Sequence, residues 1–216
     1  MAYLSQPVDT SLAARRARHG QVSTALTLLS DRLLGELLDS ASPLGAGIGG
    51  TTWLLQVEGN PVFVKRVALT DLELRPENSR STANIFGLPV WSHYGVGSAG
   101  GGAWRELAAH AMTSDWALTG QCENFLLLHH WRVLVGAAPR PLTPAERAVL
   151  ERNVAFWHGD AAVRLRLESL AGSSADLVLF LEYVPQNLLE WLGTQVRAGD
   201  HEVDTACALP SGICGP

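Results

Sequence analysis

The sequence predicts an α+β fold: an antiparallel sheet with associated helices, preceded by an N-terminal helix. Three observations indicate this fold class. A leucine stripe with helical spacing lies near the start of the chain, two β-rich segments joined by a tight turn follow it, and an apolar strand-like run lies near the end. The chain has 216 residues, of which 47% are hydrophobic and 17% charged, a composition typical of globular proteins.

The first helix is expected over Gln21–Ser40. Its apolar stripe is formed by Leu26, Leu29, Leu33 and Leu37. These leucines recur every three or four residues, which places them on one helix face. Pro43 disfavours helical backbone at Ser42, so we expect the helix to end before this pair. Residues 1–42 are therefore predicted to form an N-terminal helical extension.

A glycine-rich run, Leu44–Gly50, comes next, with glycines at positions 45, 47 and 50. Two β-rich segments follow, Thr51–Val57 and Val62–Val67, and Glu58–Pro61 reads as the turn between them. A dinucleotide-binding loop with this glycine spacing leads into a helix, whose N-terminus holds the pyrophosphate. Here the run leads into a strand, which favours a hairpin lid whose backbone N–H groups lie over phosphates.

The rest of the chain alternates polar loops with short periodic segments. The expected elements are a long loop over Asp71–Gly102, a helix over Trp104–Met112, a strand within Asn124–Val135, a helix from Thr143 toward His158, a helical continuation over Ala161–Leu170, a buried strand over Leu177–Val184 and a short helix over Asn187–Val196. Thr143-Pro144-Ala145-Glu146 is a capping box with proline at the first helical position, which marks a helix start.

Lys65 is the first candidate functional residue, because it lies among apolar neighbours in the second β-rich segment. From there it can reach phosphates under the hairpin, and a partly buried cation needs an anionic partner. Glu106 on the predicted helix is the candidate partner, with His110 four residues further along the same face. Three other carboxylates lie closer in the sequence and stay open as alternatives: Asp71, Glu73 and Glu77.

The second candidate is the segment Leu181-Glu182-Tyr183-Val184, which ends an apolar strand and precedes Pro185. An extended segment at this place can offer backbone C=O and N–H groups to the edge of an adenine ring. The glycine run, Lys65, Glu106 and this segment follow one another in the order that a nucleotide-binding lobe of the kinase type requires.

With these pieces in this order, the sequence resembles the N-terminal lobe of protein kinases and of related small-molecule kinases, over about Leu44–Val196. The resemblance implies an antiparallel sheet with one αC-type helix, and it implies ATP and Mg²⁺ as cofactors. The roles that it implies are phosphate covering by Gly45, Gly47 and Gly50, phosphate contact by Lys65, ion pairing by Glu106, a place beside the adenine pocket for Leu181, and backbone contacts to adenine by Glu182 and Val184.

The family's catalytic motifs are absent from the 216 residues: the sequence contains neither His-Arg-Asp nor Asp-Phe-Gly. Without them no residue orients the attacking hydroxyl or holds Mg²⁺. We therefore expect weak ATP binding and no phosphoryl transfer from this chain. Residues 43–196 are assigned to the kinase-like lobe with its linker, and 197–216 to an irregular tail that reads as truncated, with the C-terminal lobe missing.

Four functions stay open at this point. The first is ATP-dependent transfer of a γ-phosphoryl group to a hydroxyl, on a protein serine or threonine or on a small molecule. The second is a non-catalytic, pseudokinase-like regulatory module. The third is a dinucleotide-binding oxidoreductase, which needs a helix directly after Gly50. The fourth, an all-helical regulator, conflicts with the β-rich centre of the chain.

Charge, apolar runs and cysteine spacing limit the partners, metals and cellular location that we expect. The net charge is −5, and the richest basic stretch, Ala14–His19, is short, so we interpret it as a solvated helix face or loose arm and expect no nucleic-acid partner. No stretch approaches about 20 apolar residues, so no membrane partner is expected. The three cysteines lack zinc spacing, and no signal peptide is evident, so we expect reduced thiols, no protein-bound zinc and a cytoplasmic location.

Overall fold

The computed structural model describes residues 9–47, 50–94, 98–136, 140–186 and 188–198. The strands are β1 (Ser42–Gly47), β2 (Gly50–Val57), β3 (Asn60–Leu69), β4 (Leu128–Val135) and β5 (Ala175–Glu182). The helices are α1 (Leu12–Thr27), α2 (Asp31–Asp39), α3 (Asp71–Leu74), α4 (Ala103–Thr119), α5 (Pro144–Phe156), α6 (Ala161–Ala171) and α7 (Leu188–Ala198), with 3₁₀ helices η1 (Pro76–Asn78) and η2 (Val90–His93).

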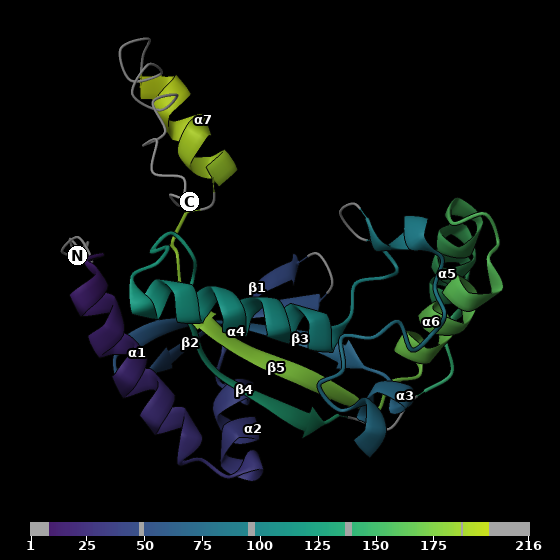
Figure 1. Ribbon diagram of the computed structural model, residues 1–216, viewed down its shortest axis with the longest axis horizontal. Helices are drawn as coiled ribbons and strands as arrows, with labels where there is room; N and C mark the ends of the chain where they lie inside the picture. The colour runs from purple at the N-terminus through teal and green to yellow at the C-terminus, as the bar shows by residue number, and fades with distance from the viewer. Residues whose placement is uncertain (1–8, 48–49, 95–97, 137–139, 187, 199–216) are drawn as a thin grey trace.

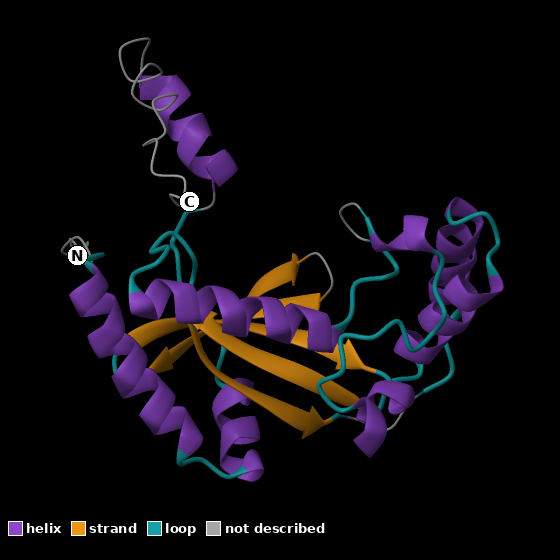
Figure 2. Ribbon diagram, in the orientation of Figure 1, coloured by secondary structure: helices purple, strands orange, loops and turns teal. Residues whose placement is uncertain are grey.

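The described strands form one five-stranded sheet in the order β1-β2-β3-β5-β4 (Figures 1 and 2). Each neighbouring pair is antiparallel. The α+β class and the antiparallel sheet expected from the sequence are therefore confirmed. Among the residues placed in the structure, no helix is both long enough and apolar enough to cross a lipid bilayer.

The β2–β3 hairpin turns where the sequence predicts, at Glu58 and Gly59. Both residues have positive φ, 49° and 74°, as the twist of a tight two-residue hairpin requires. The hairpin sets the register of β3, in which Lys65 pairs with Thr52 on β2 and with Leu179 on β5. Strand β3 is thus paired on both sides and lies at the centre of the sheet.

The two faces of the sheet carry separate cores, because successive strand residues point to opposite sides. Helices α1 and α2 pack against one face through the buried residues Val22, Leu26 and Leu34, which contact side chains such as Val64 and Phe180. Helix α4 packs against the other face through Ala103, Trp104 and Leu107, which contact residues including Val67, Leu177 and Leu181. Figure 1 shows α4 running across the sheet, while α7 stands apart from it.

The single first helix predicted over Gln21–Ser40 is wrong, because the structure has two helices there, α1 and α2. The break falls at residues 28–30, where Ser30 caps α2 by accepting a hydrogen bond from the backbone N–H of Leu33. The leucine spacing continues across this cap and hides it in the sequence. The change of direction leaves Leu33 40% exposed, whereas Leu34 is fully buried.

Other boundaries differ less from the prediction. Helix α4 continues past Met112 to Thr119, where Gly120 ends it in a left-handed conformation with φ 81°. The capping box at Thr143 is present, and α5 and α6 are separate helices. The predicted strand at Leu177–Val184 begins earlier and ends at Glu182. The long loop over Asp71–Gly102 holds α3, η1 and η2. Most of the predicted tail, 199–216, lies outside the described residues.

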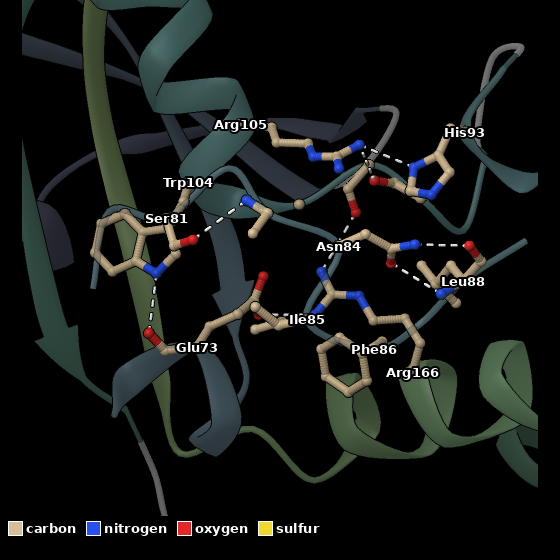
Figure 3. A pocket seen from close by; sticks show the side chains of 14 residues that line it. Glu73, Ser81, Asn84, Ile85, Phe86, Leu88, His93, Trp104, Arg105 and Arg166 are labelled. Atoms are coloured by element: carbon tan, nitrogen blue, oxygen red, sulfur yellow. Dashed lines mark hydrogen bonds and ion pairs between the residues drawn. The ribbon is translucent and has the colours of Figure 1, made fainter. Parts of the chain in front are cut away.

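The α5–α6 pair lies at the opposite end of the sheet from α1 (Figure 1). A buried ion pair joins α6 to α3, the short helix that follows β3. Arg166 on α6 is 3% exposed, and its Nη1 donates to Oε2 of Glu73 on α3 over 2.7 Å. The same Oε2 accepts from the backbone N–H and the hydroxyl of Thr70. Figure 3 shows the guanidinium of Arg166 between Glu73 and Phe86, whose ring it covers at 4.8 Å.

Arg166→Met is expected to destabilise the fold by about 3–5 kcal/mol, because it leaves the carboxylate of Glu73 buried without its cation. The matched control is Arg164→Met, two residues earlier on α6. Arg164 pairs with Glu151 at the surface, where its side chain is 39% exposed, so its loss should change the free energy of unfolding far less. Urea unfolding of both variants measures the difference, and equal free energies of unfolding would contradict the assigned role.

Candidate functional site

Lys65 lies at the middle of the central strand and points to the sheet face that α4 covers. Its neighbours on this face of β3 are Phe63 and Val67, which both contact the α4 core. The side chain of Lys65 is 16% exposed. A lysine so placed is held by paired strands on both sides, and its ammonium group needs a polar partner.

The ammonium group of Lys65 forms an ion pair with Glu106, with 2.6 Å between Nζ and Oε1. The ion pair expected from the sequence is therefore present, although 41 residues separate the two side chains. The alternatives are engaged elsewhere: Asp71 accepts a hydrogen bond from Ser174, and Glu73 pairs with Arg166. Glu77, the third alternative, is exposed on η1.

Glu106 is held as a carboxylate by its surroundings. Burial raises its pKa, but the nearby His110 and the hydrogen bond and charge of Lys65 lower it by more, so the pKa of Glu106 lies below its ordinary value. His110 Nε2 lies 3.8 Å from the same Oε1, one helical turn along α4. Glu106 also lies in the first turn of α4, where the helix dipole favours negative charge.

Trp104 fixes the helix turn that carries Glu106. Its indole N–H donates to the backbone carbonyl of Glu73 over 2.9 Å, and its side chain is 4% exposed. It also meets Trp131 on β4 edge to face, with 6.2 Å between ring centroids. Because Trp104 and Leu107 lie on the buried side of the helix, Glu106 between them lies at its edge, against Lys65.

The glycine run is mostly strand rather than loop. Gly45 and Gly47 lie in β1 and Gly50 opens β2, with Gly47 paired to Gly50 and Gly45 to Thr52. Gly45 has φ 120° beside a register shift, a conformation that L-residues rarely adopt. Residues 48–49, which follow Gly47 in the sequence, lie outside the described part of the chain.

Gly50 brings the hairpin backbone against β3. A Cβ added at Gly50 would lie 2.2 Å from the carbonyl oxygen of Arg66 and 3.5 Å from Cε of Lys65. The first distance is shorter than any non-bonded contact allows, so this position accepts only glycine without a backbone shift. The second shows that the stem of Lys65 passes beside the glycine hairpin.

The predicted adenine segment lies at the end of β5. Leu181 is 2% exposed and pairs with Phe63, so it lies on the same sheet face as Lys65. The backbone N–H of Glu182 donates to the carbonyl of Leu127 over 2.8 Å and is not available to a base. Val184 follows the strand and is 51% exposed. The structure thus aligns Leu181 with Lys65 on one face and leaves Val184 beyond the sheet edge.

Sequence reasoning missed Arg15, which belongs to the basic stretch interpreted as solvated. The interpretation is wrong for this residue, because its side chain is 11% exposed and ion-paired with Glu182. The signal was present in the basic residues of positions 14–19, but the partner lies 167 residues away. No local spacing links the two, so only the folded chain reveals the pair.

His19 and His129 extend this cluster and form a close histidine pair. Their Nδ1 atoms lie 3.2 Å apart, so one ring must donate and the other accept. Burial lowers the pKa of both side chains, that of His129 to about 4. Both rings are therefore neutral at pH 7.

Three cavities of the described chain are lined by residues other than Lys65. The one beside Arg166 and Arg105 has a volume of about 30 Å³, room for little more than a water molecule (Figure 3). A groove between α5 and α6 is lined by side chains that include Val149 and Leu167, and a shallow hollow lies beside α1 near Thr24. Within the described ranges, no three His, Cys, Asp or Glu side chains form a group that could hold a metal ion.

Alanine at position 50 should destabilise the hairpin by about 1–3 kcal/mol, because its Cβ would overlap the backbone of β3. Gly20→Ala in α1 is the control, since a Cβ there meets no atom within 4 Å. This control should stabilise the protein by up to about 1 kcal/mol through helix propensity. Unfolding in urea gives both values. A Gly50→Ala variant as stable as the wild type would show that the hairpin does not approach β3 this closely.

The histidine pair predicts a loss of stability in mild acid. The unfolded chain takes up a proton at His129 near its ordinary pKa of 6.5, whereas the folded chain takes it up only near 4. Between these values the unfolded state binds more protons, so the stability falls as the pH is lowered, by up to about 1.4 kcal/mol per pH unit.

His129→Leu should reduce this slope in unfolding measurements from pH 7 to 5. His158→Asn is the control, because His158 is exposed and asparagine tolerates its φ of 59°. A slope that is the same in wild type and His129→Leu would mean that other groups set the acid response.

The structure excludes the dinucleotide-binding oxidoreductase. Gly50–Val57 is a strand, so the helix that a dinucleotide-binding loop requires is absent after Gly50. Comparison with known proteins adds no assignment: no family model matches the chain, and no curated protein matches it.

Proposed function

We propose that this chain binds ATP on the α4 face of its sheet, as the ATP-binding lobe of a cytoplasmic protein of the protein-kinase type. The observation that carries the proposal is the 2.6 Å ion pair between Lys65 on the central strand and Glu106 on α4. In protein kinases a lysine on the third strand contacts the phosphates and pairs with a glutamate on helix αC, beneath a glycine-rich hairpin. Lys65, Glu106 and the β1–β2 hairpin supply these parts.

The ion pair gives the site its chemistry. Glu106 holds the ammonium group of Lys65 in one direction, so this group is oriented before the phosphates bind. A lysine ammonium is a compact charge that binds phosphate oxygens through charge-assisted hydrogen bonds. The β1–β2 hairpin would add backbone N–H groups, because its glycines allow the backbone to approach the phosphates closely.

The base would bind at the end of β5. Leu181 would line the apolar side of the adenine pocket, and the carbonyl of Glu182 and the backbone of Val184 would meet the polar edge of the base. ATP would enter as its magnesium complex, with the ion coordinated by the phosphates. We assign no protein ligand to the magnesium ion.

Two functions fit a bound ATP. The first is transfer of the γ-phosphoryl group to a hydroxyl of a protein serine or threonine or of a small molecule, which also needs the catalytic motifs that the 216 residues lack. The second is a non-catalytic, pseudokinase-like module that binds nucleotide and regulates a partner. The second function needs neither motif.

A thermal-shift titration with Mg·ATP on wild type and Lys65→Ala tests the site. Nucleotide binding to the folded state raises the unfolding temperature, and loss of the Lys65 contact should weaken the affinity about 10- to 100-fold. The matched control is Arg66→Ala. Arg66 lies next to Lys65 on the same strand but points to the other face, where it pairs with Asp176 over 2.8 Å.

Arg66→Ala should lower the unfolding temperature of the free protein and keep the ATP-dependent rise. Absence of any rise in the wild type, or an equal rise in wild type and Lys65→Ala, would refute the proposed phosphate site.

A further inference from the structure

Helix α1 holds the end of β5 mainly through Arg15. Arg15 Nε donates to Glu182 Oε1 over 2.9 Å, and its Nη2 donates to Oε2 over 2.7 Å, which makes a two-point contact. The same guanidinium donates to the backbone carbonyls of Glu123 and Phe125, on the segment before β4. Arg15 thus joins three parts of the chain: α1, the approach to β4 and the last residue of β5.

Glu182 is fixed from a second direction by Leu127. Its backbone N–H donates to the Leu127 carbonyl over 2.8 Å, and its Oε2 accepts from the Leu127 N–H over 3.2 Å. Its side chain is 14% exposed. Burial raises the pKa of Glu182, but the hydrogen bonds and charge of Arg15 lower it by more, so the group remains ionised at neutral pH.

The other charged groups near Glu182 do not replace Arg15. Arg18 Nη2 is 3.9 Å from Glu182 Oε1, and its Nη1 donates to the backbone carbonyl of Asp9. The rings of His19 and His129 are neutral at pH 7, because burial lowers the pKa of both. Without Arg15 the carboxylate would lose its two-point contact, and the chain after Leu181 would lose its tie to α1.

We propose that Arg15 is a positioning residue for base recognition: by fixing Glu182, it holds the backbone that follows Leu181 in the conformation that receives adenine. The inference rests on the proposed function and names the residue that governs one half of the same site. Lys65 pairs with Leu179, three residues before Glu182, so the phosphate and base contacts depend on different points of β5. Loss of Arg15 should therefore weaken binding of the base and spare that of the phosphates.

Calorimetric titration of Mg·ATP and of Mg·tripolyphosphate separates the two contributions. Arg15→Gln should weaken ATP binding about tenfold and leave the tripolyphosphate affinity unchanged, so that the preference for ATP falls tenfold. Arg16→Gln is the matched control. Arg16 is the next residue on α1 and donates to the backbone carbonyl of Leu118 instead, so this variant should keep the wild-type preference.

Glu182→Gln gives a second route to the same result, because it keeps the size of the side chain and weakens the contact with Arg15. If Arg15→Gln does not fold, as judged by its thermal transition, Glu182→Gln decides, with the same selective loss expected. An unchanged preference for ATP in the folded variants would overturn the role of Arg15. Failure of the wild type to bind either ligand would instead overturn the proposed function itself.

Discussion

The packing of α4 onto β3 and β5 is the contact on which the candidate site depends. Ala103, Trp104 and Leu107 bury one side of the helix against the sheet, and the indole N–H of Trp104 fixes its first turn to the carbonyl of Glu73. Only with the helix in this place does Glu106 meet Lys65. The ion pair is therefore a product of the apolar core beside it. A partly exposed pair adds little stability of its own, so its value lies in orienting an ammonium group.

The two faces of the sheet have different roles in this account. Helices α1 and α2 cover one face and bury the side chains around Val64 and Phe180. The other face carries α4 and Lys65. Helix α1 also pairs with Glu182 through Arg15, so this helix both contributes to the core and holds the end of β5. In the proposed function, the face under α1 and α2 makes the sheet rigid, and the face under α4 binds the nucleotide.

Much of the fold follows from local patterns in the sequence. Where the sequence did not predict the structure, the reason is physical. The β2–β3 hairpin was predictable, because alternation assigns each of its residues to a strand. Glu106 was a candidate partner of Lys65 because of its place on a predicted helix, but three other carboxylates stayed open, and the docking of α4 is what places Glu106 beside Lys65. The helix break near Ser30 was not predictable, since the leucine spacing runs through it. The ion pair between Arg15 and Glu182 was not predictable either, because it joins positions 167 residues apart and depends on how α1 docks. Local patterns specify elements, and docking specifies long-range pairs.

Covalent labelling of Lys65 by an ATP analogue tests the central claim most directly. An analogue with an acyl group on the γ-phosphate transfers that group to an amine held beside the phosphates. The account predicts acylation of Lys65, mapped by peptide mass spectrometry, and its suppression by excess Mg·ATP. Labelling that avoids Lys65, or that excess Mg·ATP leaves unchanged, would contradict it.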